Sequence, residues 1–206
     1  MATVVAPQEI RRSAFVTAAR EAFFTHGYAG TTMSSIAAAV GGSKTTLWTY
    51  FPSKQDLFVA VVDDLIETYG AALEVPMDPD EPLEEALRRF GHGMMNIVLS
   101  PPIIALHRLV TGEAGRFPEL GRLFYERGPR RGKIKLANYF AEAMQRGQMH
   151  SGDPKSAARQ FGALCQSGCH QQLMLGMIDA PTPTQIAADI EAAIDILMRA
   201  WGHSSP

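Results

Sequence analysis

The sequence predicts an all-α protein, and three observations support that prediction. Apolar residues recur at helical spacing along most of the 206-residue chain, whereas β-branched residues are scattered and never alternate for long. Glycine follows several of the periodic segments and stops them. Proline stands at or near the start of several others, where its missing N–H is tolerated. We therefore expect about nine helices.

The first part of the chain predicts a three-helix head followed by a linking helix. Gly27 and Gly41 are expected to end the first and second helices. Ser43 is a favourable N-cap for the third helix, and Ser53 is expected to cap the fourth. The expected ranges are 8–26, 33–40, 43–50 and 53–73.

The stretch EVPMDPDEP, residues 74–82, is the best candidate for a domain boundary because it is rich in proline and acid. Beyond it we expect a helical body in which one long pattern breaks near Gly128 and Pro129. The expected domains are therefore 1–53 (head), 54–74 (linking helix) and 75–206 (body). The helices expected in the body are 83–99, 102–114, 118–145, 154–177 and 183–201.

Composition and charge describe a folded chain with a mildly basic head. Apolar residues make up 46% and charged residues 19%, and the formal net charge is -2. Residues 1–60 carry five basic and three acidic side chains, whereas the remainder carries 14 basic and 18 acidic ones. A basic head on an acidic body is compatible with a polyanion that contacts the head only.

Several classes of protein are disfavoured. The N-terminus lacks the basic and apolar regions of a secretory signal, and the long uncharged stretches are too polar for membrane spans, so we expect a cytoplasmic protein without a membrane partner. Cys165 and Cys169 do not form a disulfide framework. With only His170 nearby, a metal site lacks converging ligands. Metal binding and a redox role for the thiols are alternatives to simple packing, and we expect no cofactor.

Residues 32–51 predict a helix-turn-helix, because two short helices meet at a tight glycine-containing turn. In such a unit the second helix protrudes and can enter the major groove of DNA, while Leu47 and Phe51 anchor it. Hydroxyl groups, lysines and helix N-termini are typical phosphate contacts. A helix-turn-helix that binds no DNA is the alternative. The expected contacts to double-stranded DNA are Thr31, Thr32, Ser43, Lys44, Thr45, Thr46, Trp48, Thr49, Tyr50 and Lys54.

Small residues in the expected helix 154–177 recur at alternating spacings of four and three, which lets another helix approach closely. The last helix carries a matching apolar stripe. Two such helices from each of two chains would form a homodimer, which would also double the length of DNA that is read. Packing within one chain is the alternative. The expected dimer interface is Ala158, Gly162, Cys169, Gln172, Gly176, Ile186, Ile190, Leu197 and Trp201.

Large, adaptable apolar side chains are frequent in the helices before this stripe. They predict a pocket for a mostly apolar small molecule, oriented by a histidine or a tyrosine. For each residue, ordinary core packing is the alternative. The expected pocket is lined by Phe90, Met94, Met95, His107, Val110, Phe124, Tyr139, Phe161 and Cys165.

The segment TTMSSIAAAVGGSKTTLWTYFPSKQDLF, together with FVTAAREAFFTHGY upstream, resembles the N-terminal signature of TetR-family transcriptional regulators. The resemblance covers about residues 10–60. It departs from the family pattern at Val40, Gly42, Thr45 and Trp48, which affects the expected choice of bases more than DNA binding itself. The stretch RLVTGEAGRFPELGRLFYERGP is similar, more loosely, to the C-terminal domain of the AefR-like branch.

The resemblance implies an all-helical dimer that binds an inverted-repeat operator and represses genes until a small molecule occupies the body. A DNA-binding protein that senses no ligand is one alternative. An enzyme is another, but the sequence contains no phosphate-binding glycine loop, nucleophile elbow or H-E-x-x-H motif. We therefore expect a non-enzymatic transcriptional regulator.

Overall fold

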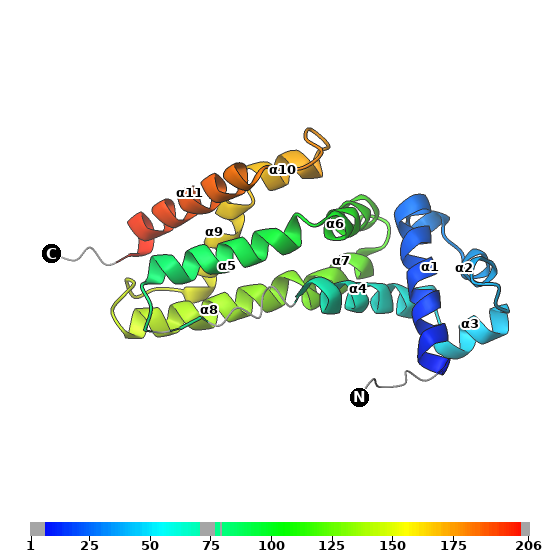
Figure 1. Cartoon of the computed structure of the whole chain (residues 1–206). Coiled ribbons are helices and arrows are strands. Elements are labelled where there is room, and N and C mark those ends of the chain that lie inside the picture. Colours follow the sequence, from blue (N-terminus) through cyan, green and yellow to red (C-terminus); the bar gives the residue numbers. More distant parts are fainter. Residues whose placement is uncertain (1–6, 71–76, 79, 203–206) are drawn as a thin grey trace, which may run out of the picture. The chain divides into compact units, whose positions relative to one another are not determined.

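The structure is a computed structural model that describes residues 7–70, 77–78 and 80–202, and these residues form the helices labelled in Figure 1. Within this part of the chain there is no β-strand, only an isolated bridge between Met149 and Gly202. The prediction of an all-α fold is confirmed. The helices are α1 Pro7–Gly30, α2 Met33–Ala39, α3 Lys44–Tyr50, α4 Lys54–Gly70, α5 Leu83–Val98, α6 Pro101–Glu113, α7 Pro118–Arg127, α8 Pro129–Gln145, α9 Pro154–Cys165, α10 Cys169–Met174 and α11 Pro183–Trp201.

The chain divides into two compact units that differ from the expected domains. The first unit contains Met1–Thr68 and Ala105–Arg127, and the second contains Tyr69–Ile104 and Gly128–Pro206. The linking helix α4, and most of α6 with α7, therefore belong with the N-terminal helices. Part of the boundary expected at residues 74–82 lies outside the described residues.

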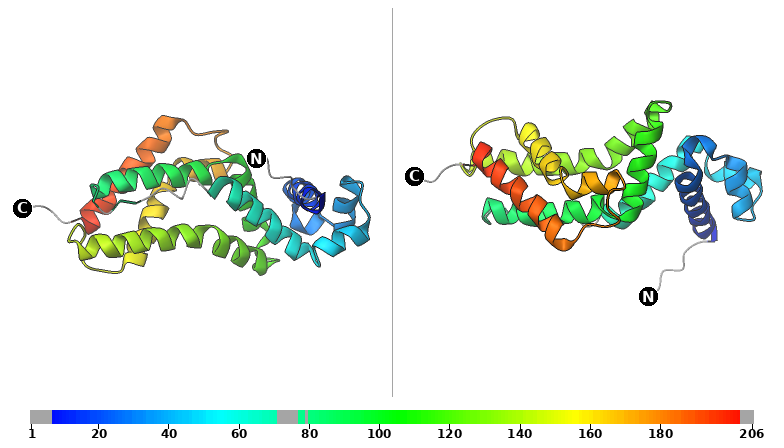
Figure 2. Two further views of the ribbon diagram at one scale, coloured as in Figure 1. Left: turned by 60° about the horizontal axis from the view of Figure 1, so that its bottom comes forward. Right: turned by 90° about the horizontal axis from the view of Figure 1, so that it is seen from above.

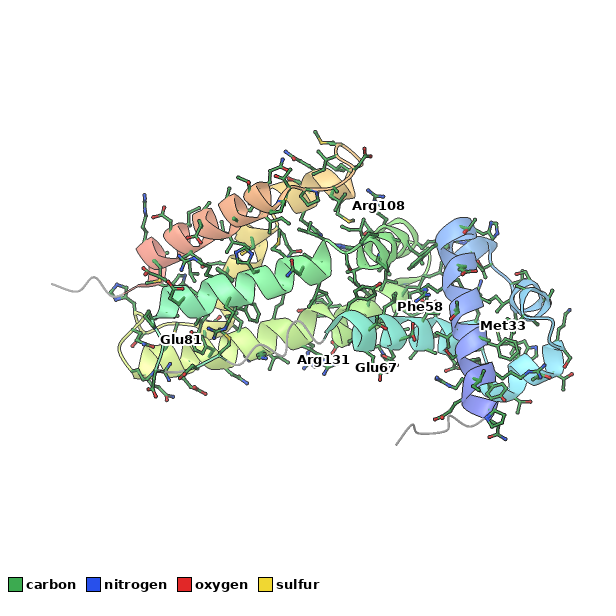
Figure 3. The ribbon with its side chains drawn as sticks, in the orientation of Figure 1. Met33, Phe58, Glu67, Glu81, Arg108 and Arg131 are labelled. Carbon is green, nitrogen blue, oxygen red and sulfur yellow. The ribbon has the colours of Figure 1, made fainter. Side chains whose placement is uncertain are left out.

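The first unit is held together by aromatic side chains from α1, α4 and the start of α7. Phe58 lies where α4 meets α1 (Figure 3), and its ring centroid is 5.7 Å from that of Phe23 and 5.6 Å from that of Tyr28. The ring of Phe117 meets Tyr28 edge-on at 5.1 Å. Phe23 and Phe58 are fully buried, so truncating either to alanine is expected to destabilise the unit by about 3–5 kcal/mol.

The second unit is a bundle in which α9 lies between α8 and α11, as Figures 1 and 2 show. Its core contains Phe90 and Met95 from α5, Phe140 from α8, Phe161 from α9 and Ile190 from α11. Gly91 allows the close approach of α5 and α11, because a Cβ at this position would lie 2.9 Å from Ile190.

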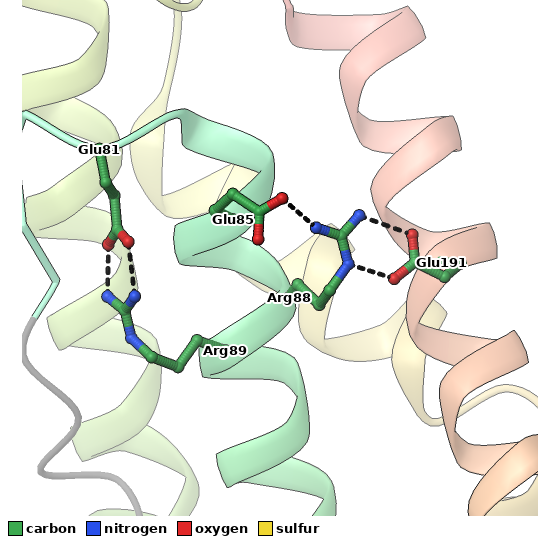
Figure 4. Close-up of polar contacts among 5 residues, drawn as sticks. All are labelled: Glu81, Glu85, Arg88, Arg89 and Glu191. Atoms are coloured by element: carbon green, nitrogen blue, oxygen red, sulfur yellow. Dashed lines mark hydrogen bonds and ion pairs between the residues drawn. The ribbon is translucent and has the colours of Figure 1, made fainter.

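Ion pairs reinforce the contact between α5 and α11 at the surface (Figure 4). Arg88 donates to Glu85 at 2.8 Å and to Glu191 of α11 at 2.9 Å, and Arg89 is paired with Glu81. Hydrogen bonds from the two arginines lower the pKa values of Glu191 and Glu81. Because these groups are largely exposed, each pair stabilises the fold by no more than about 1 kcal/mol, and the buried core dominates.

The single helix expected over residues 154–177 is wrong. The structure has α9 ending at Cys165 and a separate α10 beginning at Cys169. At the break, Gly168 lies against the carboxylate of Asp189, which leaves no room for a Cβ. Asp189 Oδ2 accepts a hydrogen bond from the backbone N–H of Cys169 at 2.8 Å, so a side chain of α11 caps α10. The break expected near Gly128 and Pro129 is confirmed, since α7 ends at Arg127 and α8 begins at Pro129.

No single helix among the described residues is long and apolar enough to cross a membrane, although α5 and α6 together reach the length and composition of a bent span. Within α5, the side chains of Leu87, Phe90 and Met95 are buried in the core of the second unit. Burial inside a protein core accounts for this apolar composition.

The capping role of Asp189 predicts that Asp189→Ala lowers the free energy of unfolding by about 1–2 kcal/mol, because the N–H of Cys169 loses its acceptor. Asp195→Ala is the matched control on the same helix, since Asp195 is exposed and pairs with the exposed Arg199; it should change stability by less than about 0.5 kcal/mol. Urea unfolding of both variants measures the difference, and equal losses would contradict the capping role.

Candidate nucleic-acid interface

The helix-turn-helix forms as the sequence predicts, and local capping explains its two short helices. Thr32 and Ser35 form a reciprocal capping box at the start of α2, with the N–H of Ser35 donating to Thr32 Oγ1 at 3.1 Å. Ser43 Oγ accepts the N–H of Thr46 at 3.1 Å and caps α3. Gly41 has φ 66°, a left-handed conformation that ends α2 and turns the chain.

The outer face of α3 presents Lys44, Thr45 and Trp48 to solvent. Trp48 is 48% exposed, which is unusual for a large aromatic side chain without a partner. The other two threonine hydroxyl groups of this helix are engaged locally: Thr46 Oγ1 lies 2.9 Å from Ser43 Oγ, and Thr49 Oγ1 donates to the carbonyl of Thr45 at 2.9 Å. Lys44, Thr45 and Trp48 are therefore the side chains most available to a partner.

One residue that was expected to contact DNA, Thr31, lies inside the head instead, and another, Tyr50, is partly covered. Thr31 is 1% exposed, and its hydroxyl donates to the carbonyl groups of Ala22 and Gly27 at 3.0 and 2.7 Å. Tyr50 is half-buried, with its ring 5.9 Å from that of Phe15. The prediction that the Thr31 side chain contacts DNA is therefore wrong, because its hydroxyl is buried and already donates to two backbone carbonyl groups of α1.

Lys54 occupies the same junction. Its Nζ donates to the carbonyl oxygens of Tyr28 and Thr31 at 2.7 and 3.0 Å and lies 4.3 Å from the centroid of the Tyr28 ring. Burial lowers the pKa of Lys54, Arg116 acts in the same direction, and Glu113 opposes the shift. These contacts give Lys54 a role inside the head that the sequence did not indicate.

α1 continues past Gly27, which was expected to end it. Gly27 has φ 73° and marks a kink, after which one more turn runs to Gly30. Glu113, at the end of α6, accepts the N–H of Ala29 at 3.1 Å, and a Cβ at Gly27 would lie 2.7 Å from its Oε1. Glu113 was missed because its partner is 84 residues away along the chain.

The residues expected to line a ligand pocket fall into both compact units. Phe90, Met95, Phe161 and Cys165 lie in the core of the second unit, and Met94 packs against that core. His107, Val110 and Phe124 belong to the first unit, where the rings of His107 and Phe124 stack at 5.4 Å and burial lowers the pKa of His107.

Tyr139 differs from the other expected pocket residues. Its side chain is 4% exposed in the core of the second unit, and its hydroxyl has no hydrogen-bond partner in the described part of the chain. A buried hydroxyl without a partner is unfavourable by about 1–3 kcal/mol, so this group stands out as a place where a ligand could be recognised.

The two cysteine thiols are not activated as nucleophiles. Burial, and to a smaller extent the neighbouring Asp189, raises the pKa of Cys165 and that of Cys169 to about 12. Both therefore remain neutral thiols at physiological pH, and a neutral buried thiol is a poor nucleophile. The residues that the structure describes contain no group of three or more His, Cys, Asp or Glu side chains that could hold a metal ion.

Four of the nine residues expected at the dimer interface are also corrected. Ala158, Cys169, Ile190 and Leu197 are buried in the core of their own unit and cannot reach a partner chain. Packing of α9 and α11 within one chain accounts for the small-residue stripe, and the break before α10 removes its regular spacing. The other expected residues are at least partly exposed: Gly162, Gln172, Gly176, Ile186 and Trp201.

Comparison with known proteins identifies the chain. Residues 15–61 match the family model of bacterial regulatory proteins of the tetR family, and residues 85–203 match that of the AefR-like transcriptional repressor C-terminal domain. The second match alone covers more than half of the chain. The chain belongs to the TetR family.

Individual relatives agree with this membership. The solved structure of the flavonoid-responsive regulator FrrA is 34% identical, with a TM-score of 0.84 over 96% of this chain and 100% of that one. The transcriptional regulator RutR of Escherichia coli K12 is 36% identical over 73 residues, and the transcriptional activator FasR of Mycolicibacterium smegmatis is 35% identical over 88. These two matches span only 34% and 40% of the curated relatives.

As a member of the TetR family, the chain is a DNA-binding transcriptional regulator with a helix-turn-helix head. The relatives are regulators rather than enzymes. Regulators of the TetR family typically act as dimers, which supports a homodimer here as well.

The two lysines of the TetR-family head predict opposite phenotypes. Lys54→Met leaves two carbonyl groups without their donor, so it should lower the free energy of unfolding by about 2 kcal/mol and leave the salt dependence of DNA binding unchanged. Lys44→Met, the matched control at an exposed site, should leave stability unchanged and make the salt dependence shallower. Thermal unfolding and binding titrations at several salt concentrations measure both; a shallower slope for Lys54→Met would show that it contacts phosphate.

Proposed function

We propose that this TetR-family regulator is a repressor that binds an inverted-repeat operator as a homodimer and leaves it when a mostly apolar small molecule binds. The observation that carries the proposal is the capped helix-turn-helix with Lys44, Thr45 and Trp48 exposed on α3. A protein that acts on genomic DNA shares its compartment, so we also propose a cytoplasmic location.

The exposed face of α3 suggests how bases are read. Residues near the N-terminus of a recognition helix contact base edges in the major groove, and Lys44 and Thr45 occupy the first two positions of α3. A lysine reads guanine, whereas a threonine offers a hydroxyl to several bases and a methyl group to thymine. We assign Thr45 to base contact and the Trp48 indole N–H to phosphate.

The proposed dimer uses the outer face of α11 rather than the buried stripe. Ala188, Ala192 and Ile196 follow one another at intervals of four residues on this face, all exposed, and Ile196 is 48% exposed. Small side chains beside an exposed apolar one allow a second helix to pack closely. Two heads joined in this way must reach major grooves about one DNA turn apart, roughly 34 Å.

The proposed effector is a phenolic, flavonoid-like molecule. The name of FrrA describes that protein as flavonoid-responsive, and it aligns with this chain over nearly its whole length. The unpartnered hydroxyl of Tyr139 in an apolar core supports a ligand that is mostly apolar and carries a hydrogen-bonding group. Such a ligand releases DNA only by the difference between its affinities for the two states of the protein.

Repression rather than activation is supported by the AefR-like family model, whose description names repressors. FasR is named an activator, so the sign of regulation depends on where the operator lies relative to the promoter. Binding upstream of a gene and blocking its transcription is the simplest outcome for a dimer that occupies DNA in its ligand-free state.

The operator is the first object to test. Genomic DNA from the source organism, sheared and retained on the protein at about 0.15 M salt, should yield a few fragments that share an inverted repeat. Thr45→Val should change the preferred base at one or two positions of each half-site, whereas Thr184→Val, an exposed control on α11, should not. Uniform retention would contradict sequence-specific binding, and an equal loss on all DNA for Thr45→Val would contradict its base contact.

The effector proposal predicts an unusual result for Tyr139→Phe. Because the hydroxyl has no hydrogen-bond partner among the residues that the structure describes, the variant should be as stable as the wild type or more stable by up to about 1 kcal/mol, while release from DNA by quercetin should need about tenfold more ligand. Tyr125→Phe is the exposed control. Loss of stability in Tyr139→Phe, or an unchanged quercetin response, would show that the hydroxyl does not serve the ligand.

A further inference from the structure

The cations of the head do not all serve the same purpose. Residues 7–60 carry five of them, and two are engaged inside the first unit: Arg20 pairs with Asp64 at 3.3 Å, and Lys54 holds two backbone carbonyls. The remaining three, Lys44, Arg11 and Arg12, are exposed, and none of them has an ion-pair partner in the described part of the chain. Exposed, unpaired cations close together are what a polyanion would contact.

All three of these cations lie at α3, although Arg11 and Arg12 belong to the first turns of α1. A Cβ built at Gly42, in the turn before α3, would lie 3.7 Å from Nη2 of Arg11. The Arg12 guanidinium lies 5.2 Å from the ring centroid of Phe51, the residue that follows α3. One arginine therefore lies near each end of α3. The start of α1 lies beside α3 in Figure 1.

We propose that Arg11 and Arg12 bind the phosphate groups on the two strands that border the major groove when α3 lies in it. This inference rests on the proposed function and extends the DNA-contacting surface beyond the helix-turn-helix at residues 32–51. The groove is about 12 Å wide and a helix with its side chains is about 10–12 Å across, so groups at the ends of α3 reach the backbone rather than the bases.

The position of each guanidinium suits this role. The Arg12 guanidinium lies over the Phe51 ring, 5.2 Å from its centroid, and the side chain is exposed, so its N–H donors remain available to a phosphate oxygen. This cation–π contact favours one position of the side chain before DNA arrives, so less conformational entropy is lost on binding. Glu9, the acid on the same turn of α1, pairs with neither arginine in the structure and leaves their charge uncompensated.

The experiment measures operator and random-sequence binding at several salt concentrations for Arg11→Gln and Arg12→Gln. Arg12→Lys keeps the charge. Arg122→Gln, an exposed arginine on α7, is the matched control. Each substitution removes two phosphate contacts from the dimer, and each contact contributes about 0.9 to the slope of log K against log salt. The slope of each glutamine variant should therefore be shallower than that of the wild type by about 1.8 on both DNAs. Affinity at about 0.15 M salt should fall about tenfold on both DNAs, whereas Arg12→Lys should keep the wild-type slope and Arg122→Gln should resemble the wild type.

The outcomes separate this inference from the proposed function. If the wild type binds its operator and the glutamine variants keep its slope, the phosphate contacts are overturned while the regulator stands. A loss confined to the operator, with an unchanged slope, would also overturn them, because it indicates base reading. If the wild type binds no DNA, the proposed function itself fails. A lower thermal midpoint in Arg12→Gln but not in Arg12→Lys, with the slope of Arg11→Gln unchanged, would assign these residues to stability instead.

Discussion

The geometry of the head depends on the hydrogen bonds made by the backbone at the end of α1. The last carbonyl groups of a helix have no partner within it, and here the carbonyls of Gly27 and Tyr28 lie at the kink and accept hydrogen bonds from side chains. Lys54 donates to the carbonyl of Tyr28, Thr31 donates to that of Gly27, and Glu113 accepts the N–H of Ala29. A left-handed glycine, a lysine, a threonine and a carboxylate from three separate segments thus hold one turn of backbone, from which α2 and α3 follow directly.

This junction changes how the head can bind DNA. The net charge of the chain is -2, so few cations are available for DNA. Of the two lysines near α3, Lys54 is hydrogen-bonded to backbone carbonyl groups. The electrostatic part of DNA affinity then falls on the few exposed cations around α3, helped by backbone N–H groups and the hydroxyl face of that helix. Such a head relies on fit in the groove and on dimerisation more than on bulk charge, which favours selectivity over tight binding to any DNA.

The parts of the fold that the sequence predicted are those specified by neighbouring residues. The N-cap at Ser43, the left-handed Gly41, and the breaks at Pro129 and Pro183 act within a turn of their own position, so their residue types reveal them. The break before α10 depends on Asp189, twenty residues after Cys169, and the burial of Thr31 and Lys54 depends on contacts with other helices. Polar residue types at a helix start are compatible with both a ligand and a tertiary partner, and only the three-dimensional packing decides between them.

The last helix shows the same ambiguity for apolar residues. α11 buries Ile190, Ala193 and Leu197 against its own unit, and on the opposite side it exposes Ala188, Ala192 and Ile196. Both sets follow helical spacing, so periodicity alone cannot say which one faces the core and which one is left for a second chain. Exposure in the single chain supports assigning the second set to the proposed dimer, because side chains that are only 0–1% exposed have almost no surface left to bury against a partner, whereas Ile196 is 48% exposed. With two apolar faces, α11 would serve both the folded body and the proposed interface.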